Sequence, residues 1–385
     1  MLRLVGYLLL SFISISIVAQ TSGNDYGTMM GEARTCFETG RFEECDSLLA
    51  ELSHLKLKLR QRRKVCQLMM DNSYYTGRQD VFLSALNSKY VKRNMDRTDY
   101  AHWSKLSQIP PTEETWPDKP VVLPLRMIGP EEHCLYGIDV SANGRALLGM
   151  IDNCCSDYSH ISTGLADQLG IRPLGKTVNV NGNKQSKAYL GVLDSLVLGG
   201  LVIRNVVFQV ADFPEALRKS YPFDLVIGNN VLFRTGDMFI DNLEGTVTFS
   251  KETADLPQNV FWSYSAHDYY VKGSLNGKEV SMLLDFGNTN TFMKKRFYDR
   301  FPSDETYVES SRTSIMMDRT WTTKTYVIKE ARFEIGDTVC ELPDVNINLE
   351  DFGSEARDGN LGVDMLRQFK NILFNAGKLY LQLND

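Results

Sequence analysis

The sequence predicts a mainly β protein in which two similar β lobes follow a small α-helical domain. Three observations predict this fold class: a helical hydrophobic period in the first hundred residues, a proline-rich break near residue 110, and a duplicated strand pattern after it. The 385 residues also exceed one compact core, because cores rarely grow beyond about 250–300 residues. We expect a helical domain over 23–107, a linker over 108–120, and β lobes over 121–252 and 258–385.

The composition is that of a folded protein, with 43% hydrophobic and 23% charged residues. Lys and Arg number 42 against 48 Asp and Glu, which leaves a net charge of −6. A protein that binds nucleic acid through its phosphates needs a basic surface. We therefore expect no nucleic-acid partner.

The amino end has the features of a secretory signal peptide over residues 1–19. Arg3 precedes an apolar run from Leu4 to Leu10, and a small residue, Ala19, stands at the expected cleavage point. This predicts an exported protein, periplasmic or secreted. A buried or uncleaved anchoring helix is the alternative.

The seven cysteines show neither a complete disulfide framework nor a zinc ribbon, because their number is odd and no C-x-x-C pair occurs. At least one thiol must stay unpaired within the chain. We expect Cys36, Cys45 and Cys66, which lie in the helical part, to be small buried hydrophobic residues.

The helical part contains a weak internal repeat. Apolar residues recur every three or four positions, and similar stretches begin at Gly40 and Gly77, 37 residues apart. This spacing is close to the period of tetratricopeptide-like helical hairpins. A plain helical bundle is the alternative.

Pro110 and Pro111 begin the proline-rich linker, since proline stops helices.

The β part repeats a pattern of strand, Asn-Gly turn, strand and acid. The turn glycines Gly144 and Gly277 each precede an aspartate, Asp152 or Asp285, by eight residues. Each copy then has an apolar-apolar-Gly landmark, at Gly228 and Gly362, and ends in an apolar strand and a glycine turn. The copies are offset by 133 to 134 residues, which indicates an internal duplication.

Two similar lobes packed about a pseudo-twofold axis place equivalent residues face to face. Asp152 and Asp285 would then form a carboxylate pair that shares one proton, because both cannot ionise easily at close range. The ionised member can take a proton from water while the protonated member donates to a carbonyl oxygen. Such a pair can hydrolyse an amide.

Residues 120–385 resemble the retropepsin-like and pepsin-like aspartic peptidases, specifically the bacterial exported kind with both lobes in one chain. The resemblance implies a bilobal aspartic-peptidase fold, catalytic roles for Asp152 and Asp285, and flap hairpins near Val178–Ala188 and Thr313–Thr325. It also implies hydrolysis of a peptide or protein substrate by activated water, with no metal or cofactor.

The acid-bearing turns depart from the Asp-Thr/Ser-Gly sequence of that family. In the family the hydroxyl braces the two turns, whereas this chain has Asn153 and Phe286 there. Asn153 can supply a replacement hydrogen bond and Phe286 cannot. Cys154 stands in place of the glycine, where a positive φ would strain it. A catalytically inactive peptide-binding protein, whose helical domain engages a partner, therefore remains the alternative function.

Other residues carry alternative interpretations. Cys154 or Cys155 could be a nucleophile with His160 as base, although unreactive thiols are the expected case. A metal site could be built from His133, Cys134, Asp152 and Cys155, with no ligand spacing to recommend it.

Asp364 could be catalytic, but Asn230 at the equivalent place in the first copy favours a structural hydrogen bond. We expect Asp224 and Asp241 to be turn residues.

Overall fold

The computed structural model describes residues 26–181, 184–264, 266–302, 307–315, 320–350 and 357–384. The signal peptide predicted over residues 1–19 lies outside the described residues and stays a prediction. Within the described ranges, no helix combines the length and the apolar character needed to cross a membrane.

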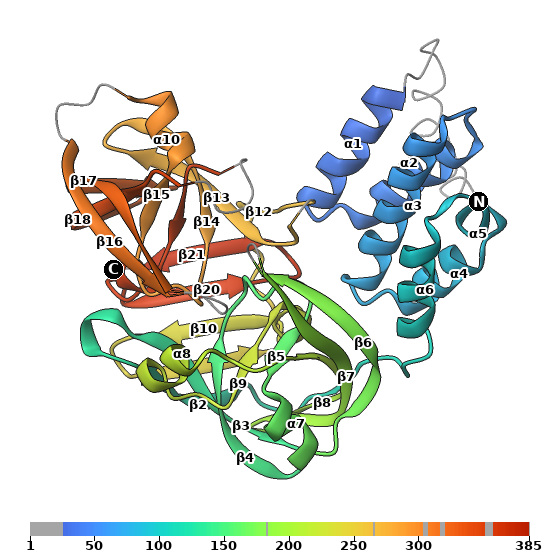
Figure 1. Ribbon diagram of the computed structural model, residues 1–385. Helices are drawn as coiled ribbons and strands as arrows, with labels where there is room; N and C mark the ends of the chain where they lie inside the picture. The colour runs from blue at the N-terminus through green and yellow to red at the C-terminus, as the bar shows by residue number, and fades with distance from the viewer. Residues whose placement is uncertain are drawn as a thin grey trace, which may run out of the picture.

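Six helices form the first part of the described chain (Figure 1). They are α1 (Tyr26–Glu38), α2 (Phe42–His54), α3 (Leu59–Tyr74), α4 (Gln79–Asn87), α5 (Lys89–Asn94) and α6 (Arg97–Leu106). Their buried side chains include the three predicted cysteines Cys36, Cys45 and Cys66. The prediction of an N-terminal helical region and of burial for these three cysteines is confirmed.

The two repeated glycines end helices in the same way. Gly40 and Gly77 have φ values of 74° and 72°, a left-handed conformation that glycine adopts without strain. The following amides close matching bonds, from Arg41 N to Cys36 O at 2.8 Å and from Arg78 N to Ser73 O at 3.0 Å. The 37-residue repeat is therefore a repeated helix–glycine–helix turn. Its assignment to the tetratricopeptide type stays a prediction.

The first lobe is built mainly of antiparallel strands with a short parallel element. Its elements are β1 (Glu113–Thr115), β2 (Val121–Ile128), η1 (Glu131–His133), β3 (Leu135–Ala142), β4 (Arg145–Ile151), β5 (Ser159–Ile161), α7 (Thr163–Gln168), β6 (Arg172–Asn181), β7 (Lys184–Leu198), β8 (Leu201–Val210), α8 (Glu215–Ser220), β9 (Leu225–Ile227), α9 (Asn229–Leu232), β10 (Asp237–Asp241) and β11 (Thr246–Ser250).

The second lobe repeats most of this order. Its elements are β12 (Val260–Trp262), β13 (Tyr269–Leu275), β14 (Lys278–Leu284), β15 (Phe292–Lys294), α10 (Lys295–Arg300), β16 (Tyr307–Ile315), β17 (Thr320–Ile335), β18 (Thr338–Asn348), β19 (Gly359–Leu361), α11 (Val363–Leu366), β20 (Asn371–Asn375) and β21 (Tyr380–Asn384). The fold is mainly β and bilobal, and a helical region precedes the two lobes in the chain, as predicted from the sequence.

The described strands form one sheet of 13 strands and one of eight. The closing strands of the two copies, β10 and β20, pair antiparallel with Asp241 opposite Asn371 and Met238 opposite Phe374. This pairing places the pseudo-twofold axis between the lobes and makes the C-terminal hairpin part of the first lobe's sheet.

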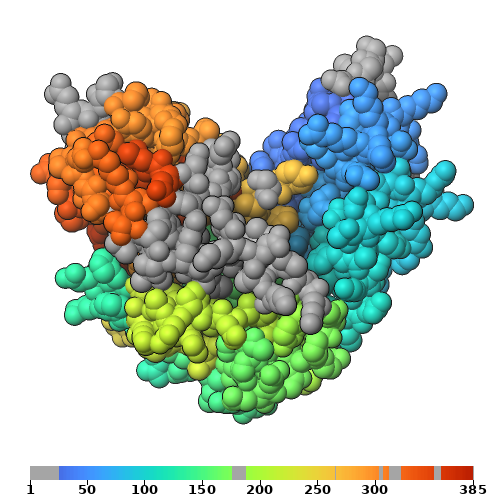
Figure 2. Space-filling model, in the orientation of Figure 1, coloured from blue at the N-terminus to red at the C-terminus, as the bar shows by residue number. Residues whose placement is uncertain are grey.

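Both hairpins predicted as flaps are present. Strands β6 and β7 pair as far as Asn181 and Lys184, and β16 and β17 pair as far as Ile315 and Thr320. The intervening residues 182–183 and 316–319 lie outside the described ranges. On the face shown in Figure 2, the helical region (blue) and the second lobe (orange) stand apart at the top, with the first lobe (green) below.

The helical region shares its core with the β part. The ring of Phe37 on α1 stacks on Trp262 of β12, with ring centroids 4.8 Å apart, and both side chains are fully buried. A second cluster joins Leu106 of α6 to Leu190 of β7 and Tyr158 of the first lobe. The helices are therefore an integral part of the folded unit.

We expect Phe37→Ala to lower the free energy of unfolding by about 3–5 kcal/mol, because it leaves a cavity against Trp262. Urea denaturation followed by tryptophan fluorescence measures this change. The matched control is Leu59→Ala, since Leu59 is 50% exposed on the same helical region. Equal effects of the two substitutions would contradict a shared core.

Candidate active site

The two aspartates predicted as catalytic occupy equivalent places at the ends of matching strands. Asp152 follows β4, which pairs parallel with β9, and Asp285 follows β14, which pairs parallel with β19. The Asp152 amide donates to Ile227 O at 3.0 Å, and the Asp285 amide donates to Leu361 O at 3.1 Å. The parallel partner strand thus fixes where each acid leaves its strand.

The landmark glycines follow these partner strands because no side chain fits there. A Cβ on Gly228 would lie 2.7 Å from Cys155 O, and one on Gly362 would lie 2.5 Å from Asn290 C. In each lobe the glycine therefore lets the strand end pass directly under the loop that follows the acid. This explains why the apolar-apolar-Gly pattern accompanies each aspartate in the sequence.

The fold brings the two acids together across the lobes. Ligand-type atoms of Asp152, Asp285 and Cys154 all lie within 4.8 Å of one another. One water hydrogen-bonded to both carboxylates spans such a distance, since each bond measures about 2.5–3.0 Å. Gly287 makes the approach possible, because a Cβ there would lie 2.2 Å from the Asp152 carboxyl carbon.

A single amide braces the two acid-bearing turns. The side chain of Asn153 is fully buried; its Nδ2 donates to Leu284 O at 2.7 Å, and its Oδ1 accepts from the Phe286 amide at 2.8 Å. It thus supplies both a donor and an acceptor from one lobe. Phe286 is released from any bracing role and packs its buried ring against Phe374, with centroids 5.5 Å apart.

The two carboxylates have different partners. Asp152 Oδ1 accepts from the amides of Cys154 and Cys155 at 2.8 and 3.2 Å, and its Oδ2 lies 3.2 Å from the Cys155 thiol. Asp285 accepts from the Gly287 amide and from Asn360 Nδ2, both at 3.1 Å. Each lobe contributes backbone donors, and a thiol acts on each acid, Cys155 on Asp152 and Cys154 on Asp285, but only Asp285 also accepts from a side-chain amide.

Burial raises the pKa of both carboxyl groups above the ordinary value. For Asp152 the effect is opposed by the Cys155 thiol and by the amides of Cys154 and Cys155. For Asp285, burial and then the charge of Asp152 raise the pKa to about 7. The pair therefore titrates together and retains one proton over the mildly acidic range.

Cys154 does not adopt the conformation that its glycine-like position suggested. It is absent from the residues with positive φ, so the turn accepts a side chain without backbone strain. Its Sγ lies beside the dyad, 3.6 Å from Leu284 O. Burial, followed by the charges of Asp285 and Asp152, raises the pKa of this thiol well above its ordinary value. Cys154 is thus a neutral thiol close to both acids.

The thiol–imidazole pair considered from the sequence does not form. The Cys155 thiol donates to Asp152 instead, and His160 Nδ1 is buried without a hydrogen-bond partner in the described chain. Burial lowers the pKa of His160 to about 4.

The metal set considered from the sequence does not gather either. His133 Nδ1 lies 3.0 Å from Asn290 Oδ1, and Cys134 lies 3.6 Å from Arg367. Among the described residues, the group with metal-ligand geometry is Asp152, Cys154 and Asp285.

Asp364 and Asn230 have the structural role expected of them. Asp364 Oδ1 accepts from the amide and the hydroxyl of Thr291, both at 2.7 Å. Asn230 Oδ1 accepts from the amide and the hydroxyl of Ser159, at 2.8 and 2.9 Å. Each fastens the short strand β15 or β5 beside a landmark glycine.

The two predicted turn aspartates differ from each other. Asp241 accepts from the amides of Leu243 and Glu244, as a turn residue does. Asp224 is not confined to a local turn, because its Oδ2 accepts from the amide of Leu148 on β4 at 2.7 Å. It fixes the start of β9 against the strand that carries Asp152.

The helical region contacts the loop that follows Asp152. His267 of the second lobe lies 2.8 Å from Asp157 of that loop and 3.7 Å from the buried Asp71 of α3. Burial alone would lower the pKa of His267, but the hydrogen bond to Asp157 and the charges of Asp71 and Asp157 outweigh it and raise the pKa to about 10. One charged imidazole thus links the helices and both lobes.

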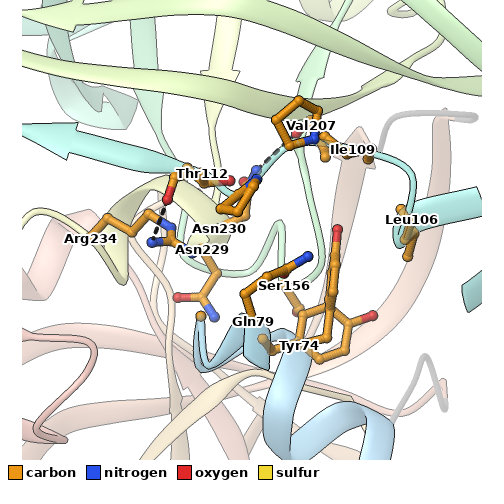
Figure 3. A pocket seen from close by; sticks show the side chains of 14 residues that line it. Tyr74, Gln79, Leu106, Ile109, Thr112, Ser156, Val207, Asn229, Asn230 and Arg234 are labelled. Atoms are coloured by element: carbon orange, nitrogen blue, oxygen red, sulfur yellow. Dashed lines mark hydrogen bonds between the residues drawn. The ribbon is translucent and has the colours of Figure 1, made fainter. Parts of the chain in front are cut away.

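A polar pocket lies along the same seam (Figure 3). Its lining includes Tyr74 and Gln79 from the helices, Ser156 from the loop after Asp152, and Asn230 and Arg234 from the first lobe. Asn230 donates to Val207 O at 2.8 Å, and Arg234 is held by an ion pair with Glu114 at 2.6 Å. Polar side chains from the helices, from the loop after Asp152 and from the first lobe therefore line this pocket.

We expect Asn153→Ala to destabilise the protein by about 2–4 kcal/mol, because Leu284 O and the Phe286 amide would be buried without partners. Chemical denaturation measures the loss. Asn87→Ala is the control, since that exposed amide bonds only within its own helix. A loss at Asn153 no larger than the control would contradict its bracing role.

Comparison with known proteins shows what the sequence around Asp152 is similar to. Residues 138–231, which include Asp152 and the first landmark glycine, match the family model described as aspartyl protease. No curated protein shows significant similarity to the sequence.

Three solved structures illustrate what the chain is similar to. A retropepsin-like aspartic protease from Rickettsia conorii is 18% identical over 36% of this chain and 92% of its own, with a TM-score of 0.26. An aspartic proteinase from Irpex lacteus is 13% identical over 69% and 98%, with a TM-score of 0.43. The soybean basic 7S globulin is 9% identical over 70% and 96%, with a TM-score of 0.41. The sequence match to the aspartyl protease family thus covers the segment of the first lobe that carries Asp152.

Proposed function

We propose that this protein is an aspartic endopeptidase that hydrolyses peptide bonds with water activated between Asp152 and Asp285. The observation that carries the proposal is the meeting of these two carboxylates, one from each lobe, within 4.8 Å. Matching backbone bonds hold both acids, and burial raises the pKa of both.

The different surroundings of the acids suggest different roles. Asp152 accepts two amide bonds and one from a thiol, which favours its ionised form and suits it to take a proton from water. Asp285, with a pKa of about 7, carries the shared proton and can donate it to the substrate carbonyl oxygen. Attack of the water on the carbonyl carbon then requires no covalent intermediate.

We further propose that the substrate is an extended peptide or protein segment lying across the junction of the lobes. The hairpins β6–β7 and β16–β17 offer strand edges with which such a segment can pair. The apolar amino end supports export of the protein to the periplasm or the exterior. The helical region is a second surface at which a protein partner could dock.

An inactive peptide-binding protein is the second candidate, and one observation favours it. The Cys154 thiol lies within 4.8 Å of both carboxylates. A bulky sulfur there would exclude the water while leaving the rest of the peptide-binding surface intact. Cleavage measurements separate the two functions.

We expect Asp152→Asn and Asp285→Asn each to reduce cleavage of a diverse peptide library by about 10²–10⁴-fold, because each removes one proton-transfer group. The assay uses the purified protein from acidic to neutral pH, with and without pepstatin. Absence of cleavage by folded wild-type protein at every pH would instead support the binding protein.

The dependence of folding stability on pH tests the raised pKa of Asp285 independently of cleavage. The folded-state pKa of Asp285 is raised, so the folded state binds more protons than the unfolded state between the two pKa values. Wild-type stability therefore falls as pH rises through this window. The Asn variant lacks this loss, and we expect it to be more stable than wild type above about pH 7. Lower stability of the variant there would contradict the raised pKa.

We expect cleavage to decline above about pH 7, where Asp285 loses the shared proton. Asn360→Ala should move this decline to higher pH, because the Asn360 amide stabilises the charged carboxylate and lowers its pKa. The profile of kcat/KM against pH measures both effects. A shift to lower pH in the variant would overturn the assignment of the proton to Asp285.

A further inference from the structure

The pleat of the second lobe brings a lysine to the face that carries Asp285. Asn360 of β19 lies opposite Leu283 on β14 and opposite Phe292 on β15. Residues opposite each other in a sheet share a face, as do residues two positions apart on a strand. Asp285, two positions after Leu283, and Lys294, two positions after Phe292, are therefore on the face of Asn360. The bond from Asn360 to Asp285 agrees with this.

Lys294 has no partner for its ammonium group within the described chain. The side chain is half-buried at the end of β15, and it makes neither an ion pair nor a side-chain hydrogen bond there. Burial, and then the charge of Arg357, lowers its pKa, whereas Asp268, Cys154 and Asp285 act in the opposite direction. The charges of Asp268 and Asp285 thus favour the charged form of Lys294.

The acids near Lys294 are already engaged. Asp268 forms a buried ion pair with Arg357 through both carboxylate oxygens. Asp285 accepts from Gly287 and Asn360 and belongs to the catalytic pair. A partly desolvated cation with no ion-pair partner among the described residues is costly, and an incoming carboxylate would relieve that cost.

We propose that Lys294 forms a subsite for a carboxylate of the substrate, so that the protein prefers an acidic side chain at one position near the scissile bond. This inference rests on the proposed peptide substrate and specifies its chemistry. At the equivalent described position the first lobe has a neutral residue: His160 pairs with β9 where Phe292 pairs with β19, so Ser162 corresponds to Lys294. The preference is therefore confined to the second-lobe side of the dyad.

The test uses non-cleavable peptides with a neutral hydroxyethylene group at the scissile position. A series places Glu, its isostere Gln or Lys at each position in turn, and competition fluorescence polarisation measures binding to the wild-type protein and to the variants. Variants are Lys294→Met, Lys294→Glu and Lys294→Arg. The matched control is Lys295→Met, because the neighbouring ammonium pairs on the surface with Asp299 at 2.6 Å.

At one position we expect wild-type protein to bind Glu about tenfold more tightly than Gln, as a charge-assisted hydrogen bond provides. Lys294→Met should abolish this ratio, Lys294→Glu should favour Lys at the same position, and Lys294→Arg and Lys295→Met should retain it. A wild-type ratio near one at every position, or an unchanged ratio in Lys294→Met, overturns the proposal.

A second series, with the same side chains but an ordinary amide at the scissile position, separates this inference from the proposed function. Its cleavage is measured beside the binding of the first series. An acidic preference in binding without any cleavage keeps the subsite and rejects the peptidase. Cleavage without an acidic preference keeps the peptidase and rejects the subsite. A shifted pH profile in Lys294→Met with no change in the Glu-to-Gln ratio would assign the lysine to the dyad alone and overturn the subsite.

Discussion

The buried amide of Asn153 is the contact on which the arrangement of the site depends. It binds Leu284 O and the Phe286 amide on the other lobe, so the two acid-bearing turns cannot separate without leaving polar groups buried and unpaired. In the aspartic peptidases that this chain resembles, a hydroxyl from each turn contributes to this bracing. Here one side chain does both parts, which frees Phe286 to fill the apolar space beneath the second turn.

This one-sided brace explains why the dyad is asymmetric. Gly287 leaves room for the Asp152 carboxylate, whereas Cys154 fills the equivalent space beside Asp285 with a thiol. Asp285 obtains an amide donor from Asn360, while the corresponding residue of the first lobe, Val226, offers none. Because the donors differ, a shared proton has a preferred location, which a fully symmetric pair would lack.

Local patterns made part of this structure predictable from sequence. The eight-residue interval from each turn glycine to its aspartate reflects a single hairpin, so Asp152 and Asp285 could be paired from spacing alone. Contacts between distant segments left no such pattern. The pairing of β10 with β20, the stacking of Phe37 on Trp262 and the position of Lys294 on the sheet face that carries Asp285 all depend on the assembled lobes. The absence of strain at Cys154 likewise required the backbone conformation.

The helical region is coupled to the site by charge as well as by packing. His267 lies between Asp71 of α3 and Asp157, five residues after Asp152, and its raised pKa keeps the imidazole charged at neutral pH. Removal of the helices would therefore expose an apolar face and take from His267 the acid Asp71. A helical segment that only covered the lobes reversibly would bury neither a shared apolar face nor an acid next to His267. The helices instead help to set the loop that carries the first acid, so a partner bound to them could alter the dyad through this loop.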